Sequence, residues 1–568
     1  MNAVRTTDKE FLADRAEQKT IAIIQLTRLG DIIQTYQAAL ELKTQNSNIR
    51  LVLIARKKFS SPLSFLLKQV FNKIIELDFQ EISSSHNLVE TSKKLTTFVN
   101  EISAEKIDVL VNLSFSKSSA YLSQLIKATH KLGMFYDERN QIRINDNWSQ
   151  YIYSNVMGSA FNGINLVDLF KFILGVKGNE TAHPIQSAPI TKRLIVHPFA
   201  SHAKKRWRPT KWIEVLSKIL RENEQIDIIL IGDKSEYLSA EQIRLAPVLA
   251  SFVDRIKNEA GKISLEEITQ LFSPETIFVG HDSMVGHLAS LKQARIVTVS
   301  LGTVRPNETS PFIEGAYNIS PRSKCFPCFP QDSCELHQCH ADIPYQVVAG
   351  ILGLLISGEE VNAKTIVQAT SLFHLSSVDI FKTYFSSAGL LDIKSTMNHE
   401  PTISDVFRKV FRVTWLYFLG RIEENQNFPQ LSNNGHKELL ARLGGLQHLF
   451  ELCEFGKKYS RFILEEISSQ VPSLAKIKDF SKKIDEIDSL QTLVKKSHPQ
   501  LAPIIDHFAV VKGNLIGENL VELTENSYLA FDDSRLVTSV TFDLLEKIIA
   551  EYKIKTTVGK MSKEEYHR

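Results

Sequence analysis

Residues 21–43, IAIIQLTRLGDIIQTYQAALELK, join a short apolar run to a turn that contains Gly30 and Asp31. In the run Ile21–Leu26, apolar residues do not alternate with polar ones, which is typical of a strand buried on both faces of a parallel sheet. A helix is expected to begin at the turn. The stretch therefore predicts a β-strand, a loop and an α-helix, the first unit of an α/β fold.

The same organisation continues to about residue 360. The polar segment 179–193, NETAHPIQSAPITKR, contains two prolines and interrupts it, so we place a domain boundary there. We expect two Rossmann-like, doubly wound domains, residues 1–185 and 186–358, that face each other across a cleft. The further strands are predicted from runs rich in Ile and Val, namely Leu51–Ala55, Val109–Leu113, Leu194–Phe199, Ile226–Gly232, Thr276–Gly280 and Ile296–Leu301.

From residue 359 the sequence changes character. Ser404–Glu424 carries an apolar stripe at helical spacing, and Pro472–His498 comes close to a short heptad pattern. Both favour helices, and we predict an all-α region over 359–568. A packed bundle is one interpretation of this region. A surface for a protein partner, or for self-association into a homo-oligomer, is another.

The bulk composition excludes some classes of protein. The 568 residues carry a net charge of +3, and 43% are hydrophobic and 23% charged. A nucleic-acid-binding protein would need a concentrated basic face, which this balance does not favour. The first twenty residues lack the apolar core of a signal peptide, and Val347–Ile356 is too short for the ~20 residues of a membrane span. We expect a cytoplasmic protein, with peripheral association at the inner membrane left open.

Asp31 is the first candidate for chemistry. In an open α/β sheet, the loop after the carboxyl end of a strand faces the ligand crevice. A carboxylate there can accept the proton of an attacking hydroxyl. The structural alternative is a helix cap, a common role of Asp at this position.

The second candidate site follows the predicted strand Leu194–Phe199. Its loop holds Lys204, Lys205, Arg206 and Arg208 together with Trp207. Such a cluster is usually a solvated face. On the crevice side of a sheet it favours a phosphate site, because cationic side chains bind phosphate through strong, charge-assisted hydrogen bonds.

The third candidate site lies in residues 263–312. Ser264 and Glu267 form a capping-box pattern that opens a helix. Asp282, directly after the strand Thr276–Gly280, is predicted to cap the next helix, with His287 inside it. Backbone N–H groups at the start of that helix could bind a diphosphate. A lone histidine is more often structural, but His287 beside a basic cluster is a better ligand candidate.

The three segments, in this order, resemble glycosyltransferase family 9. The family pattern has a leucine-glycine-aspartate turn, then a lysine-x-tryptophan segment, then glycine-x-aspartate-serine with a histidine five residues after the aspartate. The corresponding segments here are Leu29-Gly30-Asp31, Lys205-Arg206-Trp207, and Gly280-His281-Asp282-Ser283 with His287. The resemblance covers about residues 20–355. Each motif is weak by itself, and the ordered set is specific.

The resemblance implies a GT-B fold and a transferase that needs no cofactor for catalysis. Asp31 matches the family's proposed catalytic base, and Lys205 matches the lysine at the donor diphosphate. Asp282 and His287 match residues at the donor sugar and phosphates, and Glu236 occupies the place of a ribose-contacting acid. The donor-binding set predicted here is Lys205, Arg206, Trp207, Glu236, Asp282, Ser283, His287 and Thr303.

The implied reaction is an inverting transfer from a nucleoside-diphosphate sugar, with ADP-heptose as the donor. The acceptor would be the lipopolysaccharide core or a hydroxyl of a protein. One departure from the family pattern is Met284, where the family has glycine after Asp-Ser. Met284 keeps an alternative open, a catalytically degenerate GT-B scaffold whose helical region binds a protein partner. A nicotinamide dehydrogenase is disfavoured, because no G-x-G-x-x-G follows the first strand.

Four of the five cysteines lie close together in the sequence, at Cys325, Cys328, Cys334 and Cys339. A C-x2-C pair followed by two more cysteines can supply four thiolate ligands to zinc or iron. We therefore expect either a structural metal site or a group of buried thiols. Members of family 9 often have a cysteine-rich turn here, and relatives that glycosylate proteins can hold a metal in it.

Overall fold

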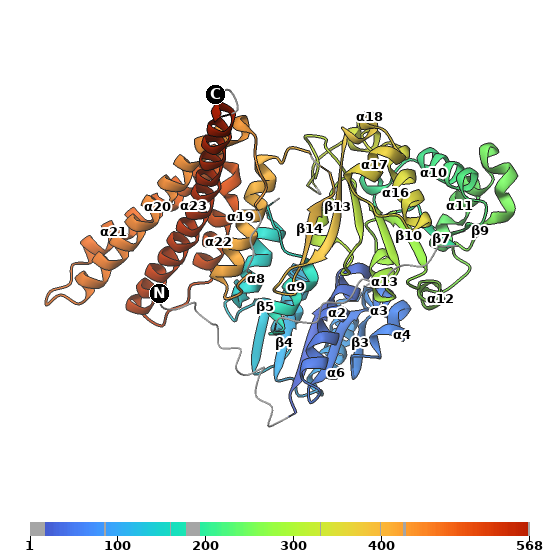
Figure 1. Ribbon diagram of the computed structural model, residues 1–568. Coiled ribbons are helices and arrows are strands. Elements are labelled where there is room, and N and C mark those ends of the chain that lie inside the picture. The colour runs from blue at the N-terminus through green and yellow to red at the C-terminus, as the bar shows by residue number, and fades with distance from the viewer. Residues whose placement is uncertain are drawn as a thin grey trace.

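The computed structural model describes residues 18–83, 87–158, 161–177, 193–329, 331–397, 399–423 and 428–565. These residues form two α/β domains and a helical region that packs beside them (Figure 1). The predicted linker lies outside the described residues except for Arg193, with which the first strand of the second domain begins. Of the residues described, no helix is both long and apolar enough to cross a membrane.

The first domain is built on a six-stranded sheet in the order β3-β2-β1-β4-β5-β6. Neighbouring strands run parallel except β6, which is antiparallel to β5. Ile21 of β1 lies beside Leu51 on one side and Val109 on the other, and all three are buried. The strands are β1 (Thr20–Gln25), β2 (Arg50–Arg56), β3 (Lys73–Leu77), β4 (Val109–Asn112), β5 (His130–Tyr136) and β6 (Ile142–Asn145).

The helices of this domain connect the parallel strands, as a βαβ arrangement requires. The longest, α2 (Leu29–Gln45), follows β1 and buries its Ile32, Ile33 and Tyr36. The others are α3 (Lys57–Ser60), α4 (Ser64–Leu67), α5 (Phe79–Ser83), α6 (Leu88–Ser103), α7 (Lys117–Leu125), α8 (Asn147–Tyr151) and α9 (Leu166–Ile173).

The second domain has an eight-stranded sheet in the order β14-β13-β12-β11-β10-β7-β8-β9. The six strands from β12 to β9 in this order run parallel to one another. They have the same order as the strands of the first sheet, which is a doubly wound topology. These strands are β7 (Arg193–His197), β8 (Asp227–Leu230), β9 (Ile256–Asn258), β10 (Thr276–His281), β11 (Arg295–Val299) and β12 (Tyr317–Pro321).

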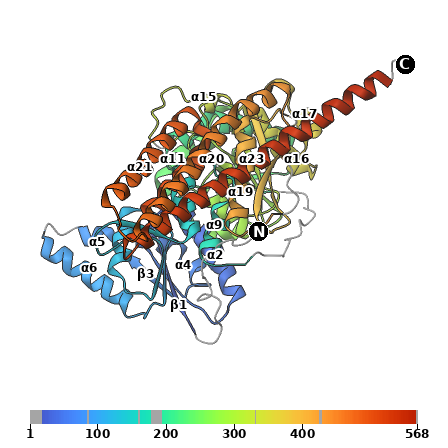
Figure 2. The ribbon, with the colours of Figure 1, turned by 90° about the vertical axis from the view of Figure 1, so that its left-hand side faces the viewer.

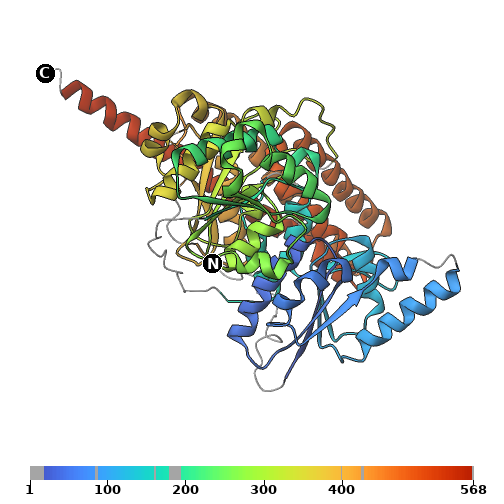
Figure 3. The ribbon, with the colours of Figure 1, turned by 90° about the vertical axis from the view of Figure 1, so that its right-hand side faces the viewer.

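The helices of the second domain cover both faces of its sheet. The apolar stretch Val347–Ile356 lies in α16, where most of its side chains are buried against the domain core. Figure 3 shows these helices stacked above those of the first domain. They are α10 (Pro209–Glu222), α11 (Tyr237–Arg244), α12 (Leu265–Gln270), α13 (Met284–Leu291), α14 (Pro306–Thr309), α15 (Gln338–Ala341), α16 (Tyr345–Ser357), α17 (Ala363–Ala369) and α18 (Leu372–Leu375).

The helical region is confirmed, but it begins later than residue 359. The strands β13 (Val378–Phe385) and β14 (Leu391–Ser395) form an antiparallel hairpin that extends the second sheet beyond β12. Val378 and Ile380 are buried while Asp379 between them is partly exposed, as in a strand with one covered face. We did not predict this hairpin, because it lacks the continuous apolar run of the central strands.

Helices make up most of the described chain after β14. They are α19 (Ile403–Phe418), α20 (Asn433–Ile467), α21 (Leu474–Ser497), α22 (Ala502–Gly513) and α23 (Leu520–Glu565). The two predicted helices correspond to α19 and α21. Figure 2 shows that the end of α23 projects away from the body of the molecule.

Arg412 joins the helical region to both α/β domains. Its guanidinium, buried in α19, donates to the carbonyl of Gly163 at 2.8 Å and to that of Leu391 in the hairpin at 3.1 Å. Glu423 pairs with the same guanidinium at 3.1 Å and compensates its charge. Removing one partner of such a buried pair typically costs several kcal/mol, so α19 is firmly anchored.

All seven predicted strands are present, and the two-domain α/β fold is confirmed. The domains meet through two helices. One is α2, which follows β1 of the first domain, and the other is α13, which follows β10 of the second domain. Ile32 and Ile33 of α2 share one buried core with Val285 and Leu288 of α13. The fold thereby brings the starts of these two helices together at the junction of the domains.

Candidate active site

The two α/β domains meet where α2 packs against α13 (Figure 1). A methyl group placed on Gly30 would lie 3.6 Å from Cδ2 of His287, so the histidine ring packs on the start of α2. Burial lowers the pKa of His287, and the carboxylates of Asp282 and Asp31 act on it in the opposite direction. The predicted base of the first domain, Asp31, and the predicted donor ligand Asp282 of the second therefore act on the same imidazole ring.

Asp31 is half-buried as the third residue of α2. Its Oδ2 accepts a hydrogen bond from the backbone N–H of Arg28 at 3.1 Å. The capping role is thus real, because the carboxylate satisfies a backbone donor at the start of its helix. The carboxylate can still accept a proton from a substrate, because it has four lone-pair positions and this hydrogen bond uses only one of them.

The loop after β7 is called the basic loop here and comprises residues 202–208. Lys205 Nζ lies 3.3 Å from Asp282 Oδ2, and both side chains are largely buried. Lys204 instead donates to the carbonyl of Asp332, and Arg206 donates to that of Ala200 at 2.8 Å. Of the four cationic residues, Lys205 is therefore the one whose charge is directed at Asp282.

The start of α13 differs from the prediction. Ser283, and not Asp282, occupies the N-cap position, and its Oγ lies 3.2 Å from Nδ1 of His197 instead of capping the helix. The prediction was wrong because β10 continues through His281, which shifts the turn by one residue. His287 is consequently the fourth residue of α13, one turn from its start.

Glu236 ends a short turn after β8. Its Oε2 accepts from the backbone N–H of Asp233 at 2.7 Å, and burial raises the pKa of Glu236. His197 Nε2 lies 4.0 Å from the same oxygen. This contact is not an ion pair at neutral pH, because burial lowers the pKa of His197 to about 4.

Trp207 and Thr303 lie at the edge of the site. The Trp207 ring is fully buried, edge-on to Trp212 with a centroid distance of 5.3 Å, so this ring belongs to the domain core and does not face the cleft. Thr303 is half-buried and follows Gly302, whose φ is +61°. A side chain at Gly302 would meet the carbonyl of Lys204 at 2.6 Å, so glycine allows this loop to pack on the basic loop.

Residues 95–338 match the sequence model of glycosyltransferase family 9, the heptosyltransferases. Over these residues the chain is similar to a glycosyltransferase family 9 domain. It is 24% identical over 291 residues to lipopolysaccharide heptosyltransferase 1 of Campylobacter coli, an alignment that covers 49% of this chain and 83% of the relative. The match identifies the protein as a glycosyltransferase.

Solved structures show further similarity. The ADP-heptose lipopolysaccharide heptosyltransferase II of E. coli is 17% identical, covers 60% of this chain over its full length, and gives a TM-score of 0.43. A glycosyltransferase family 9 protein of Veillonella parvula is also 17% identical, with 53% of this chain and 85% of that chain covered and a TM-score of 0.41.

Two histidines, His281 and His340, were not predicted to contribute to the site. His281 Nε2 accepts from the backbone N–H of Trp207 at 3.1 Å, and His340 Nε2 lies 2.9 Å from the carbonyl of Lys204. Both therefore contact the backbone of the basic loop. His281 lies inside the quoted motif, but only the fold shows that it reaches a loop 74 residues earlier in the chain.

The cysteine-rich turn lies against the same loop. Cys328 and Cys339 are buried, and burial raises the pKa of both thiols, with further increases from the neighbouring cysteines. The four cysteines thus share one region. Among the residues described, however, no three Cys, His, Asp or Glu side chains are arranged to hold a metal ion. A structural zinc or iron ion at the four cysteines stays a prediction.

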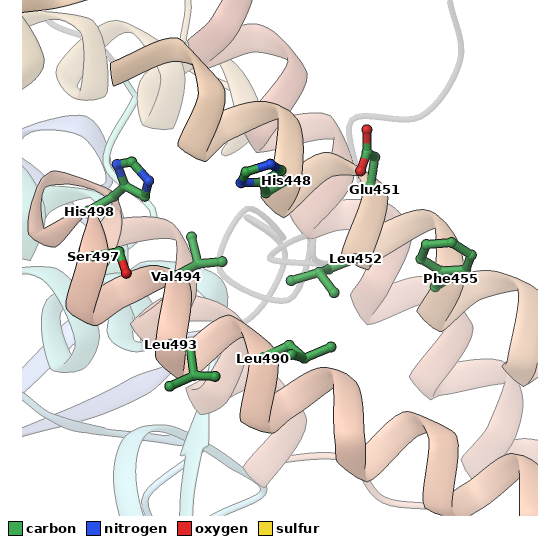
Figure 4. Close-up of a pocket in the computed structure, with 9 residues that line it drawn as sticks. All are labelled: His448, Glu451, Leu452, Phe455, Leu490, Leu493, Val494, Ser497 and His498. Carbon is green, nitrogen blue, oxygen red and sulfur yellow. The ribbon is translucent and has the colours of Figure 1, made fainter. Parts of the chain in front are cut away.

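A separate groove lies outside the matched residues 95–338, between α20 and α21, and has a volume of about 430 Å³. Figure 4 shows Leu452 and Phe455 on one side of it and Leu490 and Val494 on the other. The helical region therefore has an apolar groove of its own, apart from the predicted site residues.

Proposed function

We propose that this protein is an inverting glycosyltransferase that transfers a sugar, with heptose as the first choice, from a nucleoside-diphosphate donor to a hydroxyl group. The observation that carries the proposal is the meeting of Asp31 with Lys205, Asp282 and His287 at one cleft. Each group has the charge or hydrogen-bonding capacity that the reaction needs at that place.

The donor side is the wall formed by the second domain. Lys205 and backbone N–H groups at the start of α13 would bind the diphosphate, since a helix start carries partial positive charge. The Asp282 carboxylate would repel phosphate and is better suited to accept hydrogen bonds from sugar hydroxyls. It also holds Lys205 in place at 3.3 Å. Arg206, Glu236, Ser283 and Thr303 surround this wall as further donor-side candidates, while the buried Trp207 would position the basic loop.

The acceptor side is the start of α2. Asp31 would take the proton of the acceptor hydroxyl as its oxygen attacks the anomeric carbon. The bond from that carbon to the diphosphate oxygen breaks on the opposite face, so the configuration inverts and the nucleoside diphosphate leaves. Lys205 and the start of α13 would stabilise the charge that develops on the departing diphosphate.

The donor and the acceptor are proposed from the relatives. The matched relative is a lipopolysaccharide heptosyltransferase, which favours ADP-heptose and a lipopolysaccharide core. The helical region lies beyond the matched residues 95–338. It supports a second candidate acceptor, a protein hydroxyl, and could also mediate self-association or contact with the inner membrane.

Donor turnover tests this proposal. Purified protein and its Asp31→Ala variant are incubated with ADP-heptose and a panel of other nucleotide sugars, with host-cell lysate as the source of acceptor, and release of nucleoside diphosphate is followed. Release that requires both lysate and Asp31 is expected, and the labelled lysate component separates glycolipid from protein acceptors. Absence of binding and of release with every donor would overturn the proposal in favour of a scaffold that acts through the helical region.

A further inference from the structure

His281 lies at the carboxyl end of β10, directly before Asp282, and only 1% of its surface is exposed. Its ring packs edge-on against Trp212, with a centroid distance of 5.4 Å. The ring is therefore enclosed by the domain core and cannot contact a ligand in the cleft. Any effect of His281 on the reaction must pass through the residues that it holds.

The hydrogen bonds of His281 define its protonation state. Nε2 lies 3.1 Å from the backbone nitrogen of Trp207, which can only donate, so Nε2 must accept and carries no proton. The proton is then on Nδ1, which points to the carbonyl of Val299 on the neighbouring strand at 3.4 Å. Burial lowers the pKa of His281 to about 3, so the ring stays neutral and keeps its acceptor at neutral pH.

The Trp207 N–H belongs to the basic loop, two residues after Lys205. The opposite side of this loop is held by other contacts: His340 approaches the carbonyl of Lys204, and the Trp207 ring donates from Nε1 to the carbonyl of His340 at 3.2 Å. These contacts tie the loop to the cysteine-rich segment. His281 ties it to β10, the strand that carries Asp282.

We propose that His281 is a positioning residue, which fixes the basic loop to the end of β10 so that Lys205 Nζ is held at Asp282 and at the donor diphosphate. The inference rests on the proposed function, since it concerns how the donor site is shaped. Without an acceptor at position 281, the buried Trp207 N–H loses its hydrogen-bond partner. The free energy of that loss corresponds to about a tenfold change in a binding constant.

The test compares two variants. His281→Phe keeps a ring against Trp212 and removes the acceptor, while His281→Gln can place an amide oxygen near the position of Nε2. Calorimetric titration with ADP, the nucleotide product of the proposed donor, gives the dissociation constant. We expect His281→Phe to weaken ADP binding about tenfold, and His281→Gln to recover most of the affinity. Hydrogen exchange at the Trp207 amide should be faster in His281→Phe than in the wild type.

A double-mutant cycle shows whether the effect passes through Lys205. If it does, His281→Phe weakens ADP binding much less in a Lys205→Ala background than in the wild type. Additive losses, or unchanged ADP binding and unchanged Trp207 exchange in His281→Phe, would overturn the inference. If His281→Phe does not fold, His281→Asn, whose shorter side chain withdraws the acceptor, takes its place with the same expected results. Failure of the wild type to bind any nucleoside diphosphate would instead count against the proposed function.

Discussion

The two walls of the cleft differ in how firmly their functional groups are held. On the first domain, Asp31 is half-buried and accepts a hydrogen bond from the backbone N–H of an exposed residue, Arg28. On the second domain, Lys205 and Asp282 pair with each other, and His281 behind them is fully enclosed. A prearranged donor wall and a less constrained base suit an enzyme that binds one defined nucleotide and then admits a larger acceptor.

The largest loss of activity is expected from replacing Asp31, the less constrained residue of the first domain. Asp31→Asn keeps the size of the side chain and removes the base, so turnover with donor and acceptor should fall by about 10²–10⁴-fold. ADP affinity, measured by calorimetry, should change less than about threefold, because Asp31 belongs to the acceptor side. A large loss of ADP affinity would show that the two walls are not separate in function.

Lys205 tests the opposite wall. Lys205→Met keeps the length of the side chain and removes its charge, so ADP binding should weaken by about a hundredfold, as for a lost charge-assisted hydrogen bond. Lys204→Met is the matched control, since the Lys204 amine donates to the carbonyl of Asp332 and is not paired with Asp282. Equal losses in both variants would indicate that the basic loop acts only through its general charge.

Glu308 lies where the walls join the helical region. It is buried beside Arg305 of its own helix, and Asn162, Tyr151 and Arg408 interact with it from the first domain and from α19. Burial raises the pKa of Glu308 to about 7. Because this value exceeds that of the unfolded chain, the folded protein loses stability as pH rises from about 4.5 through 7.

Glu308→Gln removes this titration. The variant should be more stable than the wild type by about 2 kcal/mol at pH 8, with the difference vanishing below pH 5, since a pKa unit corresponds to 1.36 kcal/mol and relaxation recovers part of it. Urea unfolding at the two pH values measures the difference. A variant that is less stable at pH 8 would mean that the ionised carboxylate is needed to hold the junction together.

The buried histidines of the donor wall predict the opposite pH dependence. The pKa values of His197 and His281 are lowered to about 4 and about 3, whereas both rings would titrate near 6.5 in the unfolded chain. The unfolded state therefore binds more protons below pH 6.5, and the free energy of unfolding should fall by about 1.4 kcal/mol per pH unit for each histidine between pH 6 and 4.5. If His281→Phe left the pH dependence of the free energy of unfolding unchanged, this would contradict the interpretation of the His281 ring as enclosed and neutral.

The smallest effect is expected far from both walls, in the groove between α20 and α21. Leu493 on α21 is 54% exposed, so Leu493→Ser should change the free energy of unfolding by less than about 0.5 kcal/mol and leave ADP binding unchanged. The fully buried Leu446→Ala on α20 is the stability control and should cost about 2–5 kcal/mol. Loss of transfer to the lysate acceptor in Leu493→Ser alone would assign the groove a role in acceptor binding.

The fold could be predicted from the sequence where strands are buried on both faces and therefore form continuous apolar runs. The runs around Ile21, Leu194 and Ile296 are covered on both faces, so they contain few polar residues and identify the central strands. The hairpin that contains Val378 was missed because a strand with only one covered face mixes buried and exposed residues. Helices α20 and α23 were not distinguished, since they bury their narrow apolar stripes against each other, and that packing is a tertiary property.

The site could be predicted as a set of residues but not as a geometry. Asp31, Lys205, Asp282 and His287 were named from motifs, and the fold brings them to one cleft. The contact between Lys205 and Asp282 joins residues 77 positions apart, so no local pattern could predict it. The burial of the Trp207 ring and the role of His281 likewise depend on which loops the second sheet brings together.

A crystal structure with ADP-heptose bound to the Asp31→Asn variant tests the central claim most directly. The account predicts the diphosphate within hydrogen-bonding distance of Lys205 Nζ and the start of α13, and residue 31 facing the anomeric carbon on the side opposite the leaving diphosphate. A donor bound elsewhere, or an anomeric carbon that faces away from residue 31, would contradict it.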